Sequence, residues 1–430
     1  MIGIVQATSP QPRTAGSQPP APGPVFAWWV EADARARRAF VAASLGWMLD
    51  SFDVMLYSIV LAELVRDPAL HLSLQTAGIL NSVTLVAAAV GGIAFGVIAD
   101  RIGRKRALIA AVLIYSVFTA ACGFAQSALQ LAVFRICLGL GMGGEWATGA
   151  ALVSESFPAR HRGKALAFVQ SSWAIGYGLA ALINLVVMPV WGWRGVFFVG
   201  VLPALFTVWI QQHVDEPTIW HTAAAADRGR LGAIFEPSVA PITLAVTFMN
   251  ACCLFGWWGL NSWVPAYLRL APSQGGVGLS SQTMSLFVIA MQVGMWFGYV
   301  SFGFIADAIG RKPAYVLFIV VAALLLPLYG VVRAPAALLV LGPFVAFFGT
   351  GYYSGLGAIV AEIYPTAVRA TAAGFTYNFG RLASAAAPLT IGRVAETNGF
   401  GAAFTITGAA FLLAALSWMW IPNTQNRELT

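Results

Sequence analysis

Two aspartates, Asp50 and Asp53, lie in the middle of an apolar stretch that reads SLGWMLDSFDVMLYSIVLAELV and covers residues 44–65. At a spacing of three residues, both carboxylates lie on one face of a helix. Two carboxylates so close together in an apolar environment repel each other, which suits them to bind and release a proton. The alternative is a structural pair that a nearby arginine neutralises.

Two more charges, Arg135 and Glu145, lie inside a second apolar stretch. At ~1.5 Å of rise per residue, Arg135 is within reach of Asp53, and Glu145 is closer in height to Asp50. A charge at the centre of a bilayer is costly and normally faces a cavity or a partner. We therefore predict a proton-coupling group of Asp50, Asp53, Arg135 and Glu145, with an Asp53–Arg135 pair that loosens when the aspartate is protonated.

A second cation inside the spans, Arg381, lies near the middle of the stretch YNFGRLASAAAP. No acid of the second half of the chain lies at its depth, and its planar guanidinium suits a carboxylate. We expect Arg381 to bind the carboxylate of a substrate, or to pair with Asp50 or Asp53 when the site is empty. Other polar and aromatic candidates for substrate binding are Gln170, Asn261, Tyr377, Trp258, Gln292 and Tyr352. Trp257, Tyr353 and Asn378 are also expected near the middle of the membrane, and Gln170 and Trp173 somewhat further toward the cytoplasm.

Helices that cross a membrane must position these residues. The chain has 430 residues, of which 59% are hydrophobic and 10% are charged, whereas soluble domains have roughly 25% charged residues. Runs of about 20 apolar residues recur along the chain, which predicts an all-α polytopic membrane protein with twelve spans. The expected spans are 39–65, 74–99, 106–125, 128–153, 165–188, 194–213, 239–269, 281–306, 313–332, 336–361, 370–393 and 400–421.

The spans fall into two sets of six. We expect a disordered cytoplasmic tail at 1–38, an N-terminal six-helix bundle at 39–213, a central cytoplasmic loop at 214–238, a C-terminal bundle at 239–421 and a cytoplasmic tail at 422–430. Arg and Lys concentrate in the loops on the side of the N-terminus, which predicts that both termini are cytoplasmic. The net charge of +7 fits such loops, and no basic cluster suggests a nucleic-acid surface.

The two halves repeat each other. GVIADRIGRK at 96–105 returns as GFIADAIGRK at 303–312, and SESFPARHRGKA at 154–165 returns as AEIYPTAVRATA at 361–372. Both repeats have an offset of 207 residues, and the even number of spans between them keeps the halves in one orientation. This pattern predicts a pseudo-two-fold axis along the membrane normal and a binding site between the halves. The charges inside the spans do not repeat, so we do not expect them to be architectural.

The repeated loop motif resembles the signature of the major facilitator superfamily, and the resemblance covers residues 39–421. The stretch RICLGLGMGGEWATGAALVSESFP is similar to the sialate/lactate:proton symporter branch. The Asp-x-x-Asp of the first span is similar to the aromatic-acid:proton symporters. Both branches carry organic anions, and the family implies alternating access driven by a proton gradient.

The same resemblance implies a cytoplasmic gate that holds the outward-open state shut. A purely topological role for these charges is the alternative. The gate residues that the two motif copies supply are Asp100, Arg101, Gly103, Arg104, Glu155, Arg162, Asp307, Arg311, Glu362 and Arg369.

The sequence therefore predicts a proton-coupled symporter that imports a small organic acid across the plasma membrane. The alternative is an uncoupled or exchange carrier for a sugar or another small metabolite. Span 5 reads AIGYGLAAL, without the Gly-Pro of drug/proton antiporters, and span 7 lacks the signature of fungal lactate permeases. We expect no enzyme activity, since no catalytic triad, nucleotide loop or metal-ligand cluster appears. No cofactor is expected, the expected partners are the organic anion, protons and lipid, and the chain is expected to be a monomer.

Overall fold

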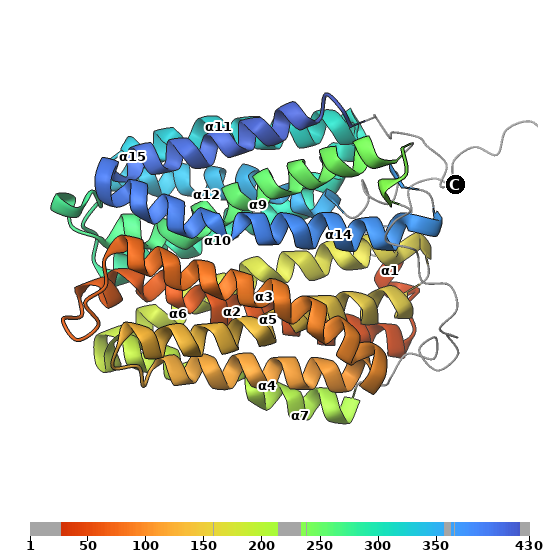
Figure 1. Ribbon diagram of the computed structural model, residues 1–430, viewed down its shortest axis with the longest axis horizontal. Helices are drawn as coiled ribbons and strands as arrows, with labels where there is room; N and C mark the ends of the chain where they lie inside the picture. The colour runs from red at the N-terminus through yellow and green to blue at the C-terminus, as the bar shows by residue number, and fades with distance from the viewer. Residues whose placement is uncertain are drawn as a thin grey trace, which may run out of the picture.

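The computed structural model describes residues 27–157, 159–213, 234–237, 239–356, 363–364 and 366–421, and all statements below concern these residues. Long helices run side by side along one axis of the molecule, and no strand occurs in the described part (Figure 1). The predicted all-α class is confirmed.

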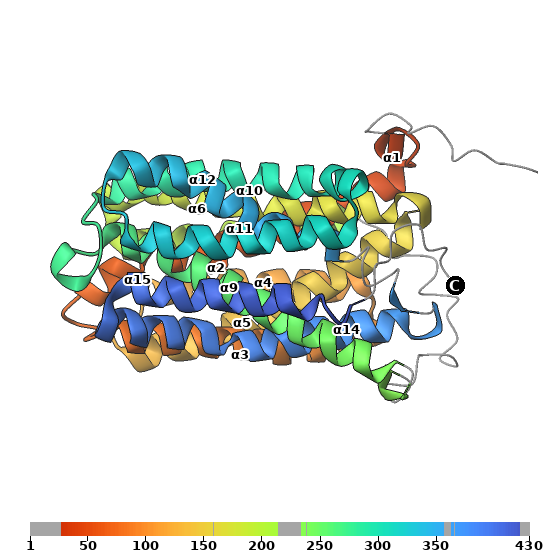
Figure 2. The same ribbon diagram turned by 90° about the horizontal axis from the view of Figure 1, so that it is seen from above.

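Two layers of helices make up the molecule. The N-terminal half contains α1 (Ala27–Val30), α2 (Ala34–Arg66), α3 (Leu74–Ile102), α4 (Arg104–Cys122), α5 (Ala128–Ser156), α6 (Ala159–Val199) and α7 (Pro203–His213). The C-terminal half contains α9 (Ala240–Arg269), α10 (Ser281–Ile309), α11 (Arg311–Val331), α12 (Pro335–Gly351), α14 (Thr366–Ser384) and α15 (Ala386–Ser417). The N-terminal half forms the lower layer of Figure 1 and the C-terminal half the upper layer. Figure 2 shows that α6 and α10, from different halves, lie along one side.

The helices cover the predicted spans, with two informative shifts. Nine stretches of the described residues are long and apolar enough to cross a membrane, and two of these cover 47 and 44 residues, enough for two crossings each. The breaks that we predicted near 188–194 and 393–400 are kinks inside α6 and α15, at Gly192 and Gly399. A further break near Ala385 divides the predicted span 370–393. Helix α2, which carries the aspartate pair, is not among the nine stretches. With two crossings in each of the two longest stretches and one more in α2, the described helices are consistent with twelve crossings.

The backbone repeats with the sequence. Gly103 and Gly310 have φ angles of 101° and 100°, and Gly192 and Gly399 have φ angles of 62° and 80°. Each pair is separated by the offset of 207 residues seen in the motifs. Positive φ angles of this kind favour glycine, which has no Cβ. The two halves therefore share special backbone positions as well as motifs.

The first span begins earlier than predicted. Helix α2 starts at Ala34, where the Asp33 side chain accepts a hydrogen bond from Ala36 N at 2.7 Å and caps the helix. Trp28 in α1 is buried against Phe40 and Phe157, which orders residues that we expected in the disordered tail. Residues 1–26 and 422–430, and 214–233 and 238 of the predicted central loop, lie outside the described part.

Polar contacts join the two halves from one end of the bundle to its middle. We call this end the Glu63 end and the opposite one, where Gly103 and Gly310 lie, the Gly103 end. At the Glu63 end, Arg269 Nε lies 2.7 Å from Glu63 Oε1, and Gln75 N donates to Glu396 Oε2 at 2.9 Å.

Further polar contacts join the two halves closer to the middle of the bundle. Asn184 Nδ2 donates to Ser281 Oγ at 3.0 Å, and Leu389 N donates to Ser82 Oγ at 3.2 Å. The halves are therefore held together from the Glu63 end inward.

Candidate functional site

One face of α2 carries a polar stripe formed by Gly46, Asp50, Asp53 and Tyr57. Spacings of four, three and four residues place them in a row along one side of the helix. This side faces α5 at both ends of the stripe, because a Cβ at Gly46 would overlap Glu145 Oε1 and the Tyr57 ring lies under the Arg135 guanidinium. Gly46 therefore leaves room for the Glu145 carboxylate beside Asp50.

Arg135 is fully buried and is held by groups without charge. Its Nη2 donates to Asn81 Oδ1 at 2.8 Å, its Nε donates to Leu80 O at 3.3 Å, and its guanidinium carbon lies 3.7 Å from the centre of the Tyr57 ring. Its Nη1 has no hydrogen-bond partner among the described residues. Contact with an aromatic face partly stabilises a desolvated guanidinium.

The predicted Asp53–Arg135 salt bridge is not formed in this conformation. Within the described part of the chain, Asp53 forms no salt bridge, and the Thr119 side chain is the hydrogen-bonding neighbour of its carboxylate. Both residues nevertheless act electrostatically on the same buried thiol, Cys122. The two groups share one region of the N-terminal half, with Arg135 turned to Asn81 instead of to the carboxylate.

Arg381 brings a positive charge from the C-terminal half to the acids of the N-terminal half. Its charge acts on both Asp50 and Glu145, as well as on Tyr377 one helical turn away. The residue is 3% exposed, and its side chain makes no hydrogen bond or salt bridge with any described residue. The expected proximity of Glu145 to Asp50 is present as well. The arrangement leaves a buried guanidinium near two carboxylic acids, without a side-chain hydrogen bond to any described residue.

Aromatic side chains from both halves meet beside this charge group. The ring centroid of Trp173 on α6 lies 5.3 Å from that of Trp257 and 6.4 Å from that of Trp258, both on α9. Trp47 on α2 packs against Trp173 at 4.7 Å. These edge contacts build an aromatic wall across the interface between the halves.

The other predicted binding residues have different surroundings. Asn261 is buried and donates to Trp257 O in its own helix, while its backbone carbonyl accepts from Tyr177 OH of the other half at 2.9 Å. The Gln292 side chain is buried, and its Oε1 has no partner among described residues. Gln170 on α6 lies near Tyr299 on α10.

Tyr352 lies inside the C-terminal bundle, contrary to the interface position that we expected. Its hydroxyl donates to Cys253 O at 3.2 Å, and its ring packs against Tyr315 and Phe411. The next residue, Tyr353, instead lies 6.5 Å from Trp257, measured between ring centroids. A shift of one residue in a helix turns the side chain by about 100°, which depth alone does not resolve.

The predicted gate falls largely outside the described side chains. Those of Asp100, Arg104, Glu155, Arg162, Asp307 and Arg369 are not described, and Glu362 lies outside the described residues altogether. Gly103 is described and provides the positive-φ turn between α3 and α4. Arg101 is exposed, and Arg311 is partly buried at the start of α11.

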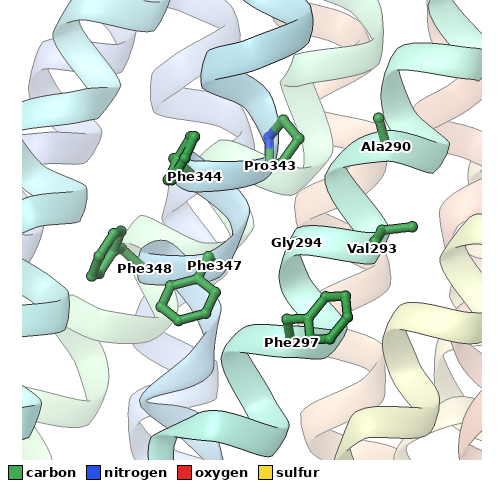
Figure 3. Close-up of a pocket in the computed structure, with 8 residues that line it drawn as sticks. All are labelled: Ala290, Val293, Gly294, Phe297, Pro343, Phe344, Phe347 and Phe348. Carbon is green, nitrogen blue, oxygen red and sulfur yellow. The ribbon is translucent and has the colours of Figure 1, made fainter. Parts of the chain in front are cut away.

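A groove of about 610 Å³ lies elsewhere, between α10 and α12. Its lining is entirely apolar, and Figure 3 shows its phenylalanine side chains around Gly294 and Pro343. Phe297 and Phe344 on its rim are more than half exposed, as expected for a face that contacts lipid tails. A wholly apolar lining does not suit a charged substrate.

Several residues of this site were missed by the sequence analysis. Gly46, Tyr57 and Asn81 carry no recognisable motif, although Gly46 lies four residues before Asp50 and Tyr57 lies four residues after Asp53. That spacing was the available signal, because it places Gly46 and Tyr57 on the helix face of the aspartate pair.

Comparison with known proteins identifies related transporters. A family model described as Major Facilitator Superfamily matches residues 43–301 and 246–430. The "Cis,cis-muconate transport protein" of Acinetobacter baylyi is 32% identical over 88% of this chain and 92% of its own length. The "Sialic acid transporter NanX" of Escherichia coli is 32% identical over 92% of this chain and 97% of its own length.

A solved structure has the same fold. The crystal structure of a D-xylose-proton symporter superposes with a TM-score of 0.76 at 21% identity, and covers 92% of this chain and 100% of its own. This likeness establishes the architecture of two helical bundles. The family model and the relatives show a membrane transport protein and not an enzyme.

Proposed function

We propose proton-coupled uptake of a small organic acid, by alternating access, for this chain, which belongs to the major facilitator superfamily of membrane transporters. The relatives named above transport muconate and sialic acid, and both compounds are carboxylates. Both halves contribute residues to the proposed site, as alternating access requires.

The observation that carries the substrate proposal is the surroundings of Arg381. A buried guanidinium without a side-chain hydrogen bond to any described residue favours a bidentate carboxylate ligand. Asp50 and Glu145 lie near enough to interact with it electrostatically when no substrate is present. A substrate carboxylate would compete with these acids for Arg381, so that substrate binding and the charge state of the acids are linked.

Proton coupling rests on the buried acids of the N-terminal half. Asp50, Asp53 and Glu145 are all buried, and Arg135 lies in the same region. Binding of a proton removes the cost of an isolated negative charge in an apolar environment. We assign the coupling proton to Asp53, which lies one turn before Tyr57, the residue whose ring contacts the Arg135 guanidinium.

The remaining assignments follow the distribution of charge. The Gly103 end carries the basic loop motifs, and we assign it to the cytoplasm of a plasma-membrane protein. We assign the cytoplasmic gate to the motif residues there. Gln170, Asn261, Tyr377, Trp258 and Gln292 are proposed to line the substrate path, with Tyr353 replacing Tyr352.

The Arg381→Lys substitution tests the carboxylate site. Lysine keeps the positive charge but lacks the planar pair of hydrogen-bond donors. We therefore expect the KM for the transported acid to rise at least tenfold, which corresponds to a loss of about 1.4 kcal/mol in binding free energy. The matched control is Arg333→Lys, since Arg333 bonds carbonyl oxygens at the Glu63 end. An unchanged KM in Arg381→Lys would contradict the assignment.

Uptake into proteoliposomes with an imposed pH gradient tests the coupling. The panel of substrates includes an aromatic acid, an unsaturated dicarboxylate, a sugar acid and a neutral sugar. We expect an acid to accumulate together with protons. Transport of the neutral sugar without proton flux would instead establish the uncoupled carrier.

A further inference from the structure

A chain of hydrogen bonds leads from Arg135 to the other half of the molecule. Arg135 Nη2 on α5 donates to Asn81 Oδ1 on α3 at 2.8 Å, and Asn81 Nδ2 donates to Ser262 Oγ on α9 at 2.8 Å. All three side chains are buried. The chain therefore crosses the interface between the halves through buried side chains only.

The amide of Asn81 is fixed in one orientation by this chain. A guanidinium can only donate, so the oxygen of the amide must face Arg135 and its NH₂ group must face Ser262. If Arg135 turns away, the amide loses the contact that orients it, and a buried donor or acceptor without a partner is costly. The contact between the halves thus depends on where Arg135 points.

Asp53 is a second acceptor to which the Arg135 guanidinium can turn. Asp53 lies one turn before Tyr57, the residue whose ring lies under the Arg135 guanidinium, and Asp53 and Arg135 both act on Cys122. The Nη1 donor of Arg135 is buried and has no partner in the described part of the chain. An ionised Asp53 would attract this guanidinium more strongly than a neutral amide does.

Other charges around Asp53 do not provide the same alternative. The titratable groups near it are Asp50 and Tyr57 on α2, Tyr115 and Cys122 on α4, Arg135 and Glu145 on α5, and Arg381 on α14. The charged residues of α3, α6 and α9 lie near the helix ends. Of the two cations in the group, Arg381 acts on Asp50 and Glu145, whereas Arg135 shares the neighbour Cys122 with Asp53.

We propose that Asn81 is a positioning residue that transmits the state of Asp53 to the contact between the two halves. When Asp53 is protonated, Arg135 binds Asn81, and Asn81 holds Ser262, so that the Glu63 end stays closed. When Asp53 is ionised, Arg135 turns to the carboxylate, the Asn81–Ser262 bond loses its orientation, and the Glu63 end opens more readily. This inference rests on the proposed role of Asp53 as the proton site.

Alkylation of a single cysteine reports the opening of the Glu63 end. The reporter is Ser82→Cys, at the contact with Leu389, in purified chain whose four native cysteines are replaced and which still transports. The reaction rate with a hydrophilic maleimide is divided by that of Ala69→Cys, an exposed position at the same end. Because both thiols react faster at higher pH, this ratio removes the pH dependence of thiol reactivity itself. In detergent solution both ends of the protein are accessible to the maleimide, so the result does not depend on the orientation of the protein in a membrane.

With the reporter alone, we expect the normalised rate at pH 5.5 to be about fivefold below that at pH 8, the factor typical of one buried hydrogen bond. Asn81→Ala and Ser262→Ala should raise the rate at pH 5.5 to the value at pH 8. Asn81→Asp should hold Arg135 permanently and give a slow rate at both pH values. The matched control is Thr84→Ala, since the Thr84 hydroxyl is buried one turn further along α3 but bonds only Leu80 O of its own helix.

The outcomes separate this inference from the proposed function. If Asn81→Ala and Ser262→Ala keep the pH dependence, or Thr84→Ala loses it equally, the role of Asn81 is overturned and proton coupling stands. If Asp53→Asn keeps the pH dependence, or the reporter alone shows none, the assignment of Asp53 fails, and the role of Asn81 fails with it. Ser262→Ala decides the question if Asn81→Ala does not fold.

Discussion

At the scale of single residues, the charge group depends on a residue that has no side chain. Gly46 leaves the space that the Glu145 carboxylate occupies next to Asp50. A methyl group there would push a buried carboxylate away from its neighbours. Position 46 therefore controls the geometry of the acids without carrying chemistry of its own.

The Gly46→Ala substitution tests this control. Alanine favours the helix by up to about 1 kcal/mol, so we expect the chain to fold, while uptake of the organic acid falls at least tenfold because Glu145 is displaced. Initial uptake rates and thermal unfolding in detergent measure the two effects. Shortening the acid in the double variant Gly46→Ala, Glu145→Asp should restore part of the uptake.

A control glycine shows whether the effect is specific. Nothing lies within 4 Å of a Cβ built at Gly374, in an exposed part of α14. Gly374→Ala should leave uptake within about twofold of the parent chain, as expected for a change that meets no neighbour. Equal losses in Gly46→Ala and Gly374→Ala would show that the Glu145 contact is unimportant.

At the scale of helices, Asp67 fastens the end of α2 to α6. It follows the last residue of α2, and its carboxylate accepts hydrogen bonds from Ala69 N at 2.9 Å, Trp193 Nε1 at 2.9 Å and Arg194 Nη1 at 3.2 Å. Burial raises the pKa of Asp67, but these hydrogen bonds and the charge of Arg194 outweigh it, so that the pKa lies below its ordinary value.

This lowered pKa predicts how stability changes with pH. A carboxyl group with a lowered pKa in the folded state stabilises the fold above its ordinary pKa of about 4, and this contribution is lost as the pH falls through the lowered value. Asp67→Asn should therefore reduce the free energy of unfolding by about 1 kcal/mol at pH 7. At pH 3 the difference from the parent chain should shrink.

Thermal unfolding in detergent at both pH values measures this difference. Trp193→Phe serves as the control, because it removes one hydrogen bond to Asp67 but no charge. We expect a smaller loss than for Asp67→Asn at pH 7, and this loss should also shrink at pH 3, because the indole donor favours the ionised carboxylate. A constant difference between Asp67→Asn and the parent chain would mean that the carboxylate does not fasten the helices through its charge.

The helices themselves were largely predictable from the sequence. Apolar runs gave the spans, because a segment that crosses a bilayer must hide its backbone from lipid and expose apolar side chains. The sequence predicts separate spans on either side of Gly192 and Gly399, where the structure has kinks within α6 and α15. A kink and a loop between two helices both interrupt the run of apolar residues, so hydropathy alone does not distinguish them. The short α1 was missed because its order comes from the packing of Trp28 against residues far along the chain.

The candidate site was predictable only in part. Buried charges such as Asp53 and Arg381 stand out against apolar sequence, and their depth follows from the rise of the helix. Depth does not fix direction around the helix axis, which is why Tyr352 was chosen in place of Tyr353. Nor does it fix the partner of Arg135, because a neutral amide such as Asn81 carries no sequence signal of its own.

At the scale of the whole molecule, repeated architecture carries charges that do not repeat. The glycine turns and loop motifs recur in both halves, whereas Asp53 and Arg135 belong to the first half and Arg381 to the second. The two halves can therefore move as similar bodies while making different contributions to the site. What differs between conformations is the set of contacts that joins the halves.

The ion pair between Glu63 and Arg269 is one of these contacts. Arg269 Nε lies 2.7 Å from Glu63 Oε1, and Arg66 Nη2 donates to Arg269 O at 3.0 Å. Side chains of both partners are 22% exposed, so water weakens the pair, and exposed ion pairs contribute about 0–1 kcal/mol. Arg269→Ala should therefore raise the population open at the Glu63 end by up to about fivefold.

Spin labels at Ala69→Cys and Gln274→Cys, exposed positions of the two halves at this end, measure that population as a longer interlabel distance. Arg333→Ala is the matched control, because Arg333 lies at the same end but bonds Gly275 O and Gly276 O within its own half. The charge-exchanged double variant Glu63→Arg, Arg269→Glu should restore the short distance. If Arg333→Ala opens the molecule as much as Arg269→Ala does, closure depends on the positive charge of this end and not on the pair that joins the halves.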